Sequence, residues 1–255
     1  MSWTRLVRAE LRKLTTTKMP WAFLAVLVAI SATTASAVVW GTDADGTKGF
    51  VSTAADQQSL MAFGGNAMVI AGLFGAIAVA REYAQGTVIP TFLSSPRRHR
   101  AVLAQLVAVA IGGAVLGLVG AALTVAAVAV TLPTTECGFM VSTGGVARVV
   151  AAASFAGATG AVLGAGIGAV VRNPGGAVAG VVLVLIIAPP LIVQLISDAS
   201  LWVPSPLAVA LSGVSPEAAG VESQASTVGA ILVLAAWAVV PAVIGLLAVQ
   251  RRDVV

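Results

Sequence analysis

The first residues that could do chemistry form the stretch GTDADGTK at residues 41–48. Its two glycines have the separation of a phosphate-binding loop, but Thr47 and Lys48 stand where such a loop has Lys followed by Ser or Thr. It also fails as a calcium loop, because the twelfth position counted from Asp43 is Ala54 and not a glutamate. We therefore interpret this stretch as a polar turn without bound nucleotide or calcium.

The remaining reactive side chains are isolated from one another. His99 is the only histidine and Cys137 the only cysteine, so neither an internal disulfide nor a metal site of several cysteines or histidines can form. The sequence also lacks the HExxH and G-x-S-x-G patterns of hydrolases. We therefore expect no catalytic, cofactor-binding or metal-binding residues in this chain, which leaves an intramembrane enzyme as a disfavoured alternative.

The composition determines what kind of fold must position the remaining polar residues. The chain of 255 residues is 58% hydrophobic and 9% charged, whereas a soluble domain has roughly 25% charged residues. Too few charges are present to cover a water-exposed surface, so lipid must be the solvent for most of the chain. The net charge of +4 forms no basic face, so we expect no nucleic-acid partner.

Six apolar runs are long enough to be membrane spans. They cover residues 20–40, 60–80, 101–131, 148–171, 176–197 and 228–249. Backbone amides in hydrocarbon must bond within their own segment, and these runs lack the alternating polarity of a barrel strand. The sequence therefore predicts an all-α integral membrane protein with six transmembrane helices, in a single domain over residues 1–255.

Charges at the ends of these runs predict the orientation. If the amino terminus is cytoplasmic, one side of the membrane has only Lys48 and Arg148. The other side has 12 of the 14 cations, namely Arg5, Arg8, Arg12, Lys13, Lys18, Arg81, Arg97, Arg98, Arg100, Arg172, Arg251 and Arg252. Because cytoplasmic loops are enriched in Lys and Arg, both termini are predicted to be cytoplasmic. The 11 arginines against 3 lysines indicate a GC-rich bacterial genome, and hence a bacterial plasma membrane.

Two further elements are predicted beside the spans. Residues 1–19 have an apolar stripe of Trp3, Leu6, Val7, Leu11 and Leu14 at helical spacing, which predicts an amphipathic helix at the membrane interface, in contact with lipid. The alternative is a signal peptide cleaved after residues 35–37, but its apolar run would be unusually long. Residues 198–227 are too apolar for a free loop and too short to cross twice, so a re-entrant element is expected there.

Energy for transport is the next constraint. The apolar runs contain almost no ionisable residue away from their ends, whereas ion-coupled carriers generally need such a residue at mid-membrane. We therefore favour an external source of energy for transport. An ATP-independent channel or secondary transporter stays an alternative. Glycines at every fourth position, such as Gly160, Gly164 and Gly168, predict close helix packing, either within one subunit or between two.

The polar stretch REYAQGTVIPTFLSSPRRHR, residues 81–100, separates the second and third runs on the cytoplasmic side. Gly86 allows a sharp turn and Thr87 is a suitable residue to begin a helix. Val88, Ile89, Phe92 and Leu93 would then share one face of a short helix, ended by Ser95-Pro96. Such a face either lies in the headgroups or enters a groove on a partner.

This stretch resembles the loop between helices two and three in the permease subunits of ABC-2 type ABC transporters. The residues that match are Glu82, Gly86, Thr87, Phe92, Leu93, Ser95, Pro96, Arg97 and Arg98. The interfacial helix, the six spans and the element before the last span extend the resemblance over the whole chain. Ile89 and Gln105 depart from it, because many members have a glutamate and a lysine near these positions.

The resemblance implies a function. Residues 81–100 would form a coupling loop whose helix enters a cleft of a separate cytoplasmic ATP-binding subunit, which would hold ATP and Mg. Glu82, Gly86 and Thr87 would shape the joint, and Val88, Ile89, Phe92 and Leu93 would fill the cleft. Arg97 and Arg98 would contact acidic groups of that subunit or anchor the loop at the membrane. Two permease chains, identical or different, would form the pathway of an exporter.

Overall fold

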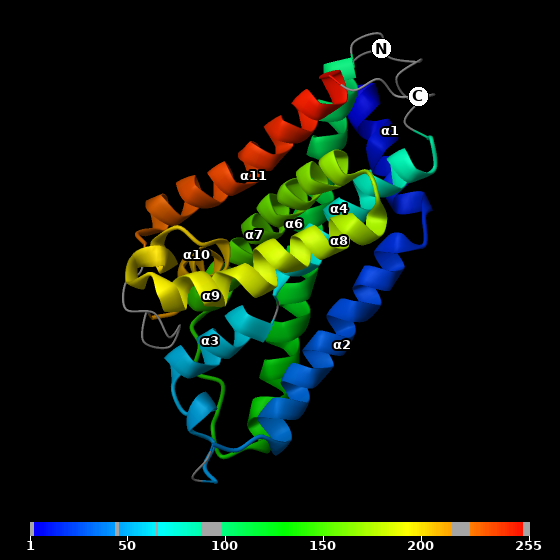
Figure 1. Ribbon diagram of the computed structural model, residues 1–255. Coiled ribbons are helices and arrows are strands. Elements are labelled where there is room, and N and C mark those ends of the chain that lie inside the picture. The colour runs from blue at the N-terminus through cyan, green and yellow to red at the C-terminus, as the bar shows by residue number, and fades with distance from the viewer. Residues whose placement is uncertain (1–2, 44–45, 65, 88–97, 216–224, 252–255) are drawn as a thin grey trace.

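The computed structural model describes residues 3–43, 46–64, 66–87, 98–215 and 225–251, and every regular element in these ranges is a helix (Figure 1). The long elements are α1 (Trp3–Thr16), α2 (Met19–Trp40), α3 (Ala54–Gly64), α4 (Ala67–Ala84), α6 (Arg98–Thr131), α7 (Thr143–Val171), α8 (Pro174–Val182), α9 (Ala188–Leu195), α10 (Pro204–Leu211) and α11 (Thr227–Arg251). Short turns of helix are η1 (Gly49–Val51), η2 (Leu132–Thr134), η3 (Leu183–Ile187) and η4 (Ser197–Leu201). The predicted all-α fold is confirmed.

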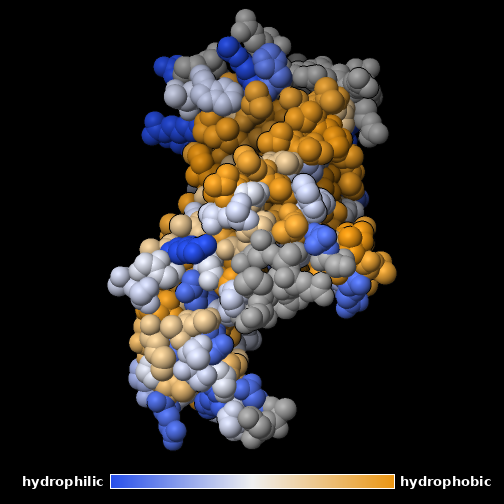
Figure 2. Space-filling view, turned by 90° about the vertical axis from the view of Figure 1, so that its left-hand side faces the viewer, coloured by the Kyte–Doolittle hydropathy of each residue, from blue (hydrophilic) through white to orange (hydrophobic). Residues whose placement is uncertain are grey.

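Six segments of the described chain are long and apolar enough to cross a membrane, as the sequence predicts. They are Met19–Trp40, Ala54–Ala84, His99–Thr134, Thr143–Val171, Pro174–Leu195 and Thr227–Val249. Large apolar side chains such as Leu183, Leu191 and Leu232 are exposed on their outer faces. Figure 2 shows the hydrophobic residues gathered in a broad band, with hydrophilic residues beyond both of its ends. The protein is therefore a multi-pass membrane protein whose outer surface suits hydrocarbon.

The second and fifth segments are less regular than the sequence analysis expected. In the second, predicted over residues 60–80, α3 ends at Gly64 and α4 begins at Ala67, while Asn66 between them has a left-handed φ of 31°. Asparagine tolerates this conformation better than most residues. In the fifth, the π-helical turn η3 separates α8 from α9, because Pro189 and Pro190 lack the amide hydrogens that an α-helix needs there.

Helix α7 lies at the centre of the bundle and packs against α4, α6 and α11. Gly160, Gly164 and Gly168 face the backbone of α4, and a Cβ atom built at Gly164 would collide with the carbonyl oxygen of Gly72. On another face of α7, Gly157 meets the backbone of α6 at Gly113 in the same way. The glycine stripes thus allow close packing within one chain.

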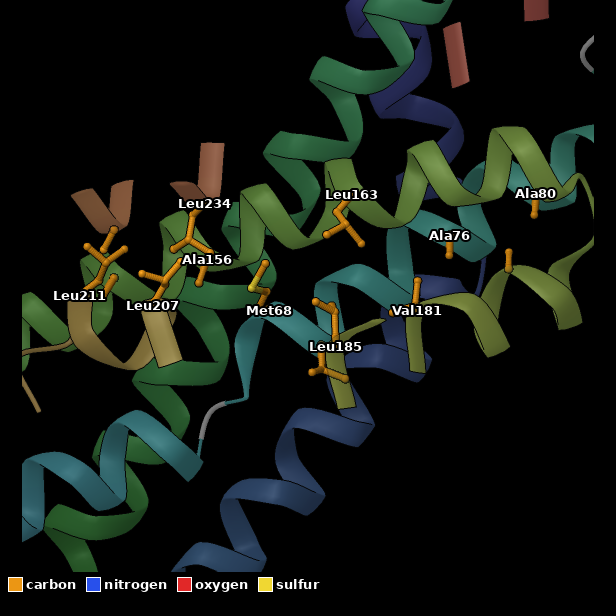
Figure 3. Close-up of a cluster of buried hydrophobic side chains, with 14 residues drawn as sticks. Met68, Ala76, Ala80, Ala156, Leu163, Val181, Leu185, Leu207, Leu211 and Leu234 are labelled. Atoms are coloured by element: carbon orange, nitrogen blue, oxygen red, sulfur yellow. The ribbon is translucent and has the colours of Figure 1, made fainter. Parts of the chain in front are cut away.

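A buried apolar cluster joins several segments around α7. It includes Met68, Leu163, Leu185, Leu207 and Leu234, so the segments around α4, α7, η3, α10 and α11 share one core (Figure 3). Beside it lies a cavity of about 530 Å³, whose lining is largely apolar. One wall of this cavity is formed by Ser205 and Ala208 of α10 and by Ser212, which follows the helix.

Candidate functional site

The candidate site is the base of the loop at residues 81–100, where α4 ends near α1 and the start of α6. Gly86 has a φ of 67°, so the left-handed turn that the sequence allows there is present. Its amide donates to the Tyr83 carbonyl oxygen at 3.2 Å, and the Thr87 hydroxyl donates to the Glu82 carbonyl oxygen at 3.2 Å. The last turn of α4 is thereby closed before the chain continues.

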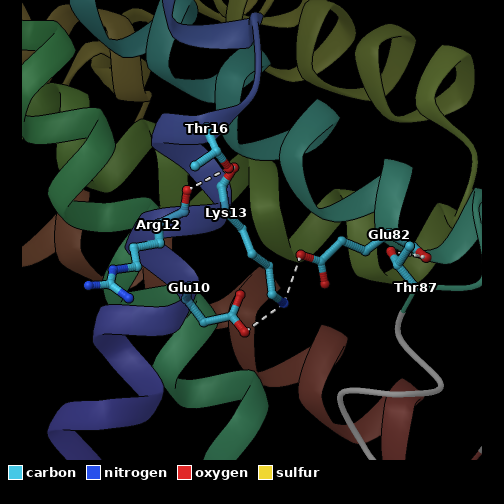
Figure 4. A network of polar contacts seen from close by, with 6 residues as sticks. All are labelled: Glu10, Arg12, Lys13, Thr16, Glu82 and Thr87. Atoms are coloured by element: carbon cyan, nitrogen blue, oxygen red, sulfur yellow. Dashed lines mark hydrogen bonds and ion pairs between the residues drawn. The ribbon is translucent and has the colours of Figure 1, made fainter.

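The Glu82 side chain points from this last turn toward α1 (Figure 4). Lys13 Nζ lies 3.3 Å from Glu82 Oε1 and 2.7 Å from Glu10 Oε1, so one ammonium group binds two carboxylates. The carboxylate side chains are 8% exposed for Glu10 and 19% for Glu82, whereas that of Lys13 is 40% exposed. Because both carboxylates are largely removed from water, the lysine is the group that compensates their charge.

The surroundings of Lys13 and Glu82 determine the charge of the lysine and the contacts of the carboxylate. Burial lowers the pKa of Lys13, but the hydrogen bond to Glu10 and the nearby charges of Glu82 and Glu10 outweigh it, so the pKa is raised above 10.5. Lys13 therefore stays charged at neutral pH. The Gln105 side chain of α6 lies close to the Glu82 side chain. Glu82 consequently binds α4 to α1 and lies beside α6.

The predicted site residues divide into two groups. Glu82, Gly86 and Thr87 lie together at the end of α4, as described above. Val88, Ile89, Phe92, Leu93 and Arg97 lie outside the described residues, so the coupling helix stays a prediction. Arg98 begins α6, and its side chain is also outside the description.

Two members of this cluster were not predicted from the sequence. Lys13 was counted only among the cytoplasmic cations, and Glu10 was given no role. The structure buries Leu6 and Glu10 on one face of α1, which packs against α6. The sequence did contain a signal for this cluster. Glu10 is an acid among four cations and lies three residues before Lys13, and side chains at this spacing meet on a helix.

The opposite end of the bundle has its own polar contacts. Gln57 is fully buried; its amide donates to Val51 O at 3.1 Å and Gly138 O at 2.9 Å, and its oxygen accepts from Met140 N at 2.9 Å. In the stretch 41–48, Lys48 Nζ donates to the carbonyl oxygens of Val38 and Val39 at 2.8 and 2.6 Å, which are orphan acceptors at the end of α2. These groups hold the connecting segments together.

Helix α10 is held at the same end of the bundle. Arg148 Nε donates to Leu211 O at 3.0 Å, and Gln58 Nε2 donates to Ser212 O at 2.6 Å. Just before α10, Trp202 O accepts from the indole nitrogen of Trp237 in α11 at 2.7 Å. Side chains from α3, α7 and α11 therefore fix the position of this short helix. We call the Arg148 and Gln58 contacts the α10 latch.

Comparisons with known proteins agree with this arrangement of apolar helices. A comparison with curated proteins finds no match. The family model described as ABC-2 family transporter protein matches residues 4–254, and so covers α1, all six candidate spans and the loop at 81–100. The match covers nearly the whole chain, and the chain therefore belongs to the ABC-2 family of transporter proteins as a permease.

Proposed function

We propose that this chain is the permease subunit of an ATP-driven exporter in a bacterial plasma membrane. Two permease chains form the translocation pathway, and a separate cytoplasmic subunit holds ATP and Mg. Family membership over residues 4–254 is the observation that carries this proposal. The six apolar segments and the distribution of 12 cations to one side support the membrane topology, with both termini in the cytoplasm.

In this proposal residues 88–97 enter the ATP-binding subunit, and the site at the end of α4 transmits their movement. Closure of two ATP-binding subunits would displace the loops of the two permeases. Gly86 sets the direction in which the loop leaves α4 through its φ of 67°. The contacts of Glu82 with Lys13 and Gln105 would carry the displacement into α1 and α6. Coupling therefore needs the contacts at the end of α4 as well as the apolar helix of the loop.

We further propose that α1 lies at the cytoplasmic membrane interface. Trp3 is exposed at one end of the helix, and Arg5, Arg8 and Arg12 are exposed on the face away from the buried Leu6. A helix with an apolar side packed on the bundle and cations on its outer side suits anionic lipid headgroups. Its ion pair with Glu82 would then hold the coupling loop at headgroup depth.

The region before α11 is proposed to be re-entrant from the outer side. α10 is apolar, and its Leu207 and Leu211 are buried in the shared core. The α10 latch satisfies the carbonyl groups at its end, which would otherwise lack partners beside hydrocarbon. A short helix of this kind can lie within the membrane because its polar backbone is covered by protein.

Co-expression with the cognate ATP-binding subunit tests the proposal. We expect the two chains to copurify, and we expect ATP-dependent transport in proteoliposomes. The double variant Phe92→Asp and Leu93→Asp should abolish copurification and transport, because two charges cannot enter an apolar cleft. The matched control is Phe139→Asp with Met140→Asp, two exposed side chains far from this loop.

Two results would contradict the proposed function. Unchanged copurification and transport in the Phe92 and Leu93 variant would show that the loop does not couple the ATP-binding subunit to transport. Transport by the purified chain without ATP or a second subunit would favour an ATP-independent channel or secondary transporter.

A further inference from the structure

The structure assigns Arg172 as a positioning residue that joins the end of α4 to the α7–α8 turn and to α11. This inference rests on the proposed function and extends it, because it names a second connection through which the coupling loop acts. Arg172 lies one residue after α7, and its side chain reaches Tyr83, the neighbour of Glu82 in the last turn of α4. The residue is far from the loop in sequence.

The backbone of Arg172 shows that this arginine occupies a position that favours glycine. Its φ is 57°, and its amide donates to Gly168 O at 2.9 Å, which closes α7. Asn173 follows directly as the N-cap of α8, where its side chain accepts from Gly176 N at 3.1 Å. Two residues therefore reverse the chain. Glycine would adopt this left-handed conformation more easily, so the turn alone does not explain an arginine.

The side chain has contacts that a glycine could not provide. Arg172 Cζ lies 5.1 Å from the centroid of the Tyr83 ring, within the range of a cation–π contact. Arg172 Nη2 donates to Ala248 O of α11 at 3.4 Å. The described residues place no carboxylate within ion-pair distance of Arg172, and its buried Nε has no hydrogen-bond partner among them. The aromatic ring is thus a major electrostatic partner of a partly buried cation.

These contacts place the last turn of α4 between two connections. Through Glu82 it is held to α1 and α6, and through Tyr83 it is held to the α7–α8 turn and α11. A displacement of the coupling loop would therefore reach both sides of the bundle. Without the Arg172 contact the ATP-binding subunit would still bind, but its closure would move α8 and α11 less.

The decisive experiment compares three substitutions at Arg172 in the complex with the ATP-binding subunit. Arg172→Gly suits the backbone and removes the side chain, Arg172→Lys keeps the charge without the planar group, and Arg172→Gln removes the charge. For each we would measure copurification, ATP hydrolysis and transport per ATP hydrolysed. We expect normal copurification for all three and at least a fivefold lower transport per ATP for Gly and Gln. Lys should lie between these variants and the original chain.

Substitutions of Tyr83 provide an independent arm. Tyr83→Phe keeps the aromatic face and should leave transport per ATP within twofold, whereas Tyr83→Leu should reduce it as far as Arg172→Gln. The double variant Tyr83→Leu with Arg172→Gln should be no worse than either single variant, because both remove the same contact. Lys18→Gln, which removes an exposed cation just before α2, is the control for lost charge.

Several outcomes separate failure of this inference from failure of the proposed function. If Arg172→Gly couples as well as the original chain, only the turn matters and the inference is wrong, while the proposed function stands. If the double variant loses the product of the two single losses in transport per ATP, the two residues act independently, and the Tyr83 contact is not the cause. If the original chain neither binds an ATP-binding subunit nor transports with ATP, both the proposed function and this inference are wrong.

Discussion

Lys13 Nζ lies 3.3 Å from Glu82 Oε1, although 69 positions separate the two residues in the sequence. Lys13→Gln should therefore leave two largely buried carboxylates, Glu10 and Glu82, without their cation. We expect a loss of about 1–3 kcal/mol in the free energy of unfolding, since hydrogen bonds to charged groups contribute about this much. Thermal unfolding in detergent measures the loss.

The control for this prediction is Arg8→Gln, which removes an exposed cation from the same helix. It should change the unfolding temperature by less than about 1 °C, because exposed charges contribute little. Exchanging the charges, with Lys13→Glu and Glu82→Lys, should recover part of the stability. Equal effects of Lys13→Gln and Arg8→Gln would show that the ion pair contributes nothing.

The same ion pair predicts a pH dependence on the alkaline side. The pKa of Lys13 is raised in the folded protein above 10.5, so folding favours the protonated amine. Its contribution to stability is full below pH 10.5 and decreases as the pH rises through the folded pKa. The difference in unfolding temperature between the original chain and Lys13→Gln should thus be constant from pH 7 to 9 and should shrink at higher pH. A difference that grows with pH would contradict this sign.

The contact between α7 and α4 predicts a large effect at Gly164. Gly164→Leu would place a side chain where even a Cβ meets the backbone of Gly72, so the helices must separate. We expect a loss of at least about 3 kcal/mol, beyond the usual range for overpacking, because backbone cannot move aside as a side chain can. Gly144→Ala near the start of α7 is the control, since the nearest atom to a Cβ there is Ser142 Oγ at 3.8 Å. Similar unfolding temperatures for both variants would argue against the close contact.

Gln57 predicts a second loss of stability, at the other end of the bundle. Gln57→Leu keeps the volume but leaves the carbonyls of Val51 and Gly138 and the amide of Met140 without their partner. Each unsatisfied buried group costs roughly 1–3 kcal/mol, although water can compensate some of this near the surface. We expect about 2–4 kcal/mol in total. The exposed Gln194→Leu should have little effect, and equal losses would contradict the role of Gln57.

The α10 latch predicts a change in accessibility. In a chain with Cys137→Ser, a cysteine introduced as Ser212→Cys should react slowly with a membrane-impermeant maleimide, because Ser212 is 5% exposed. Adding Arg148→Gln removes a donor to the end of α10 and should accelerate the reaction several-fold. Adding Arg5→Gln instead should not. Unchanged rates with Arg148→Gln would show that Arg148 does not hold α10 in place.

The apolar runs could be predicted because a span of about 20 apolar residues is a property of local sequence. The left-handed turn at Gly86 and the glycine contacts of α7 follow from local rules in the same way. Contacts between distant segments could not be predicted. Lys13 shares its helix with Arg5, Arg8 and Arg12, and periodicity alone does not show which cation faces α4.

Arg172 was missed for a related reason. From the sequence alone, Arg172 was one of twelve predicted cytoplasmic cations, because counting charges takes no account of backbone conformation. Its φ of 57° and its place over Tyr83 depend on how α7 and α8 meet α4. The division of the second segment at Asn66 was also unpredicted, because low helix propensity alone rarely ends an apolar helix.

The glycine faces of α7 restrict how this protein can change shape. Backbone touches backbone at Gly164 and Gly72 on one side and at Gly157 and Gly113 on the other, which leaves no flexible side chains to absorb sliding or rotation. We therefore expect the three helices α4, α6 and α7 to move together. Any alternation between inward-facing and outward-facing forms would then have its hinges outside these three helices.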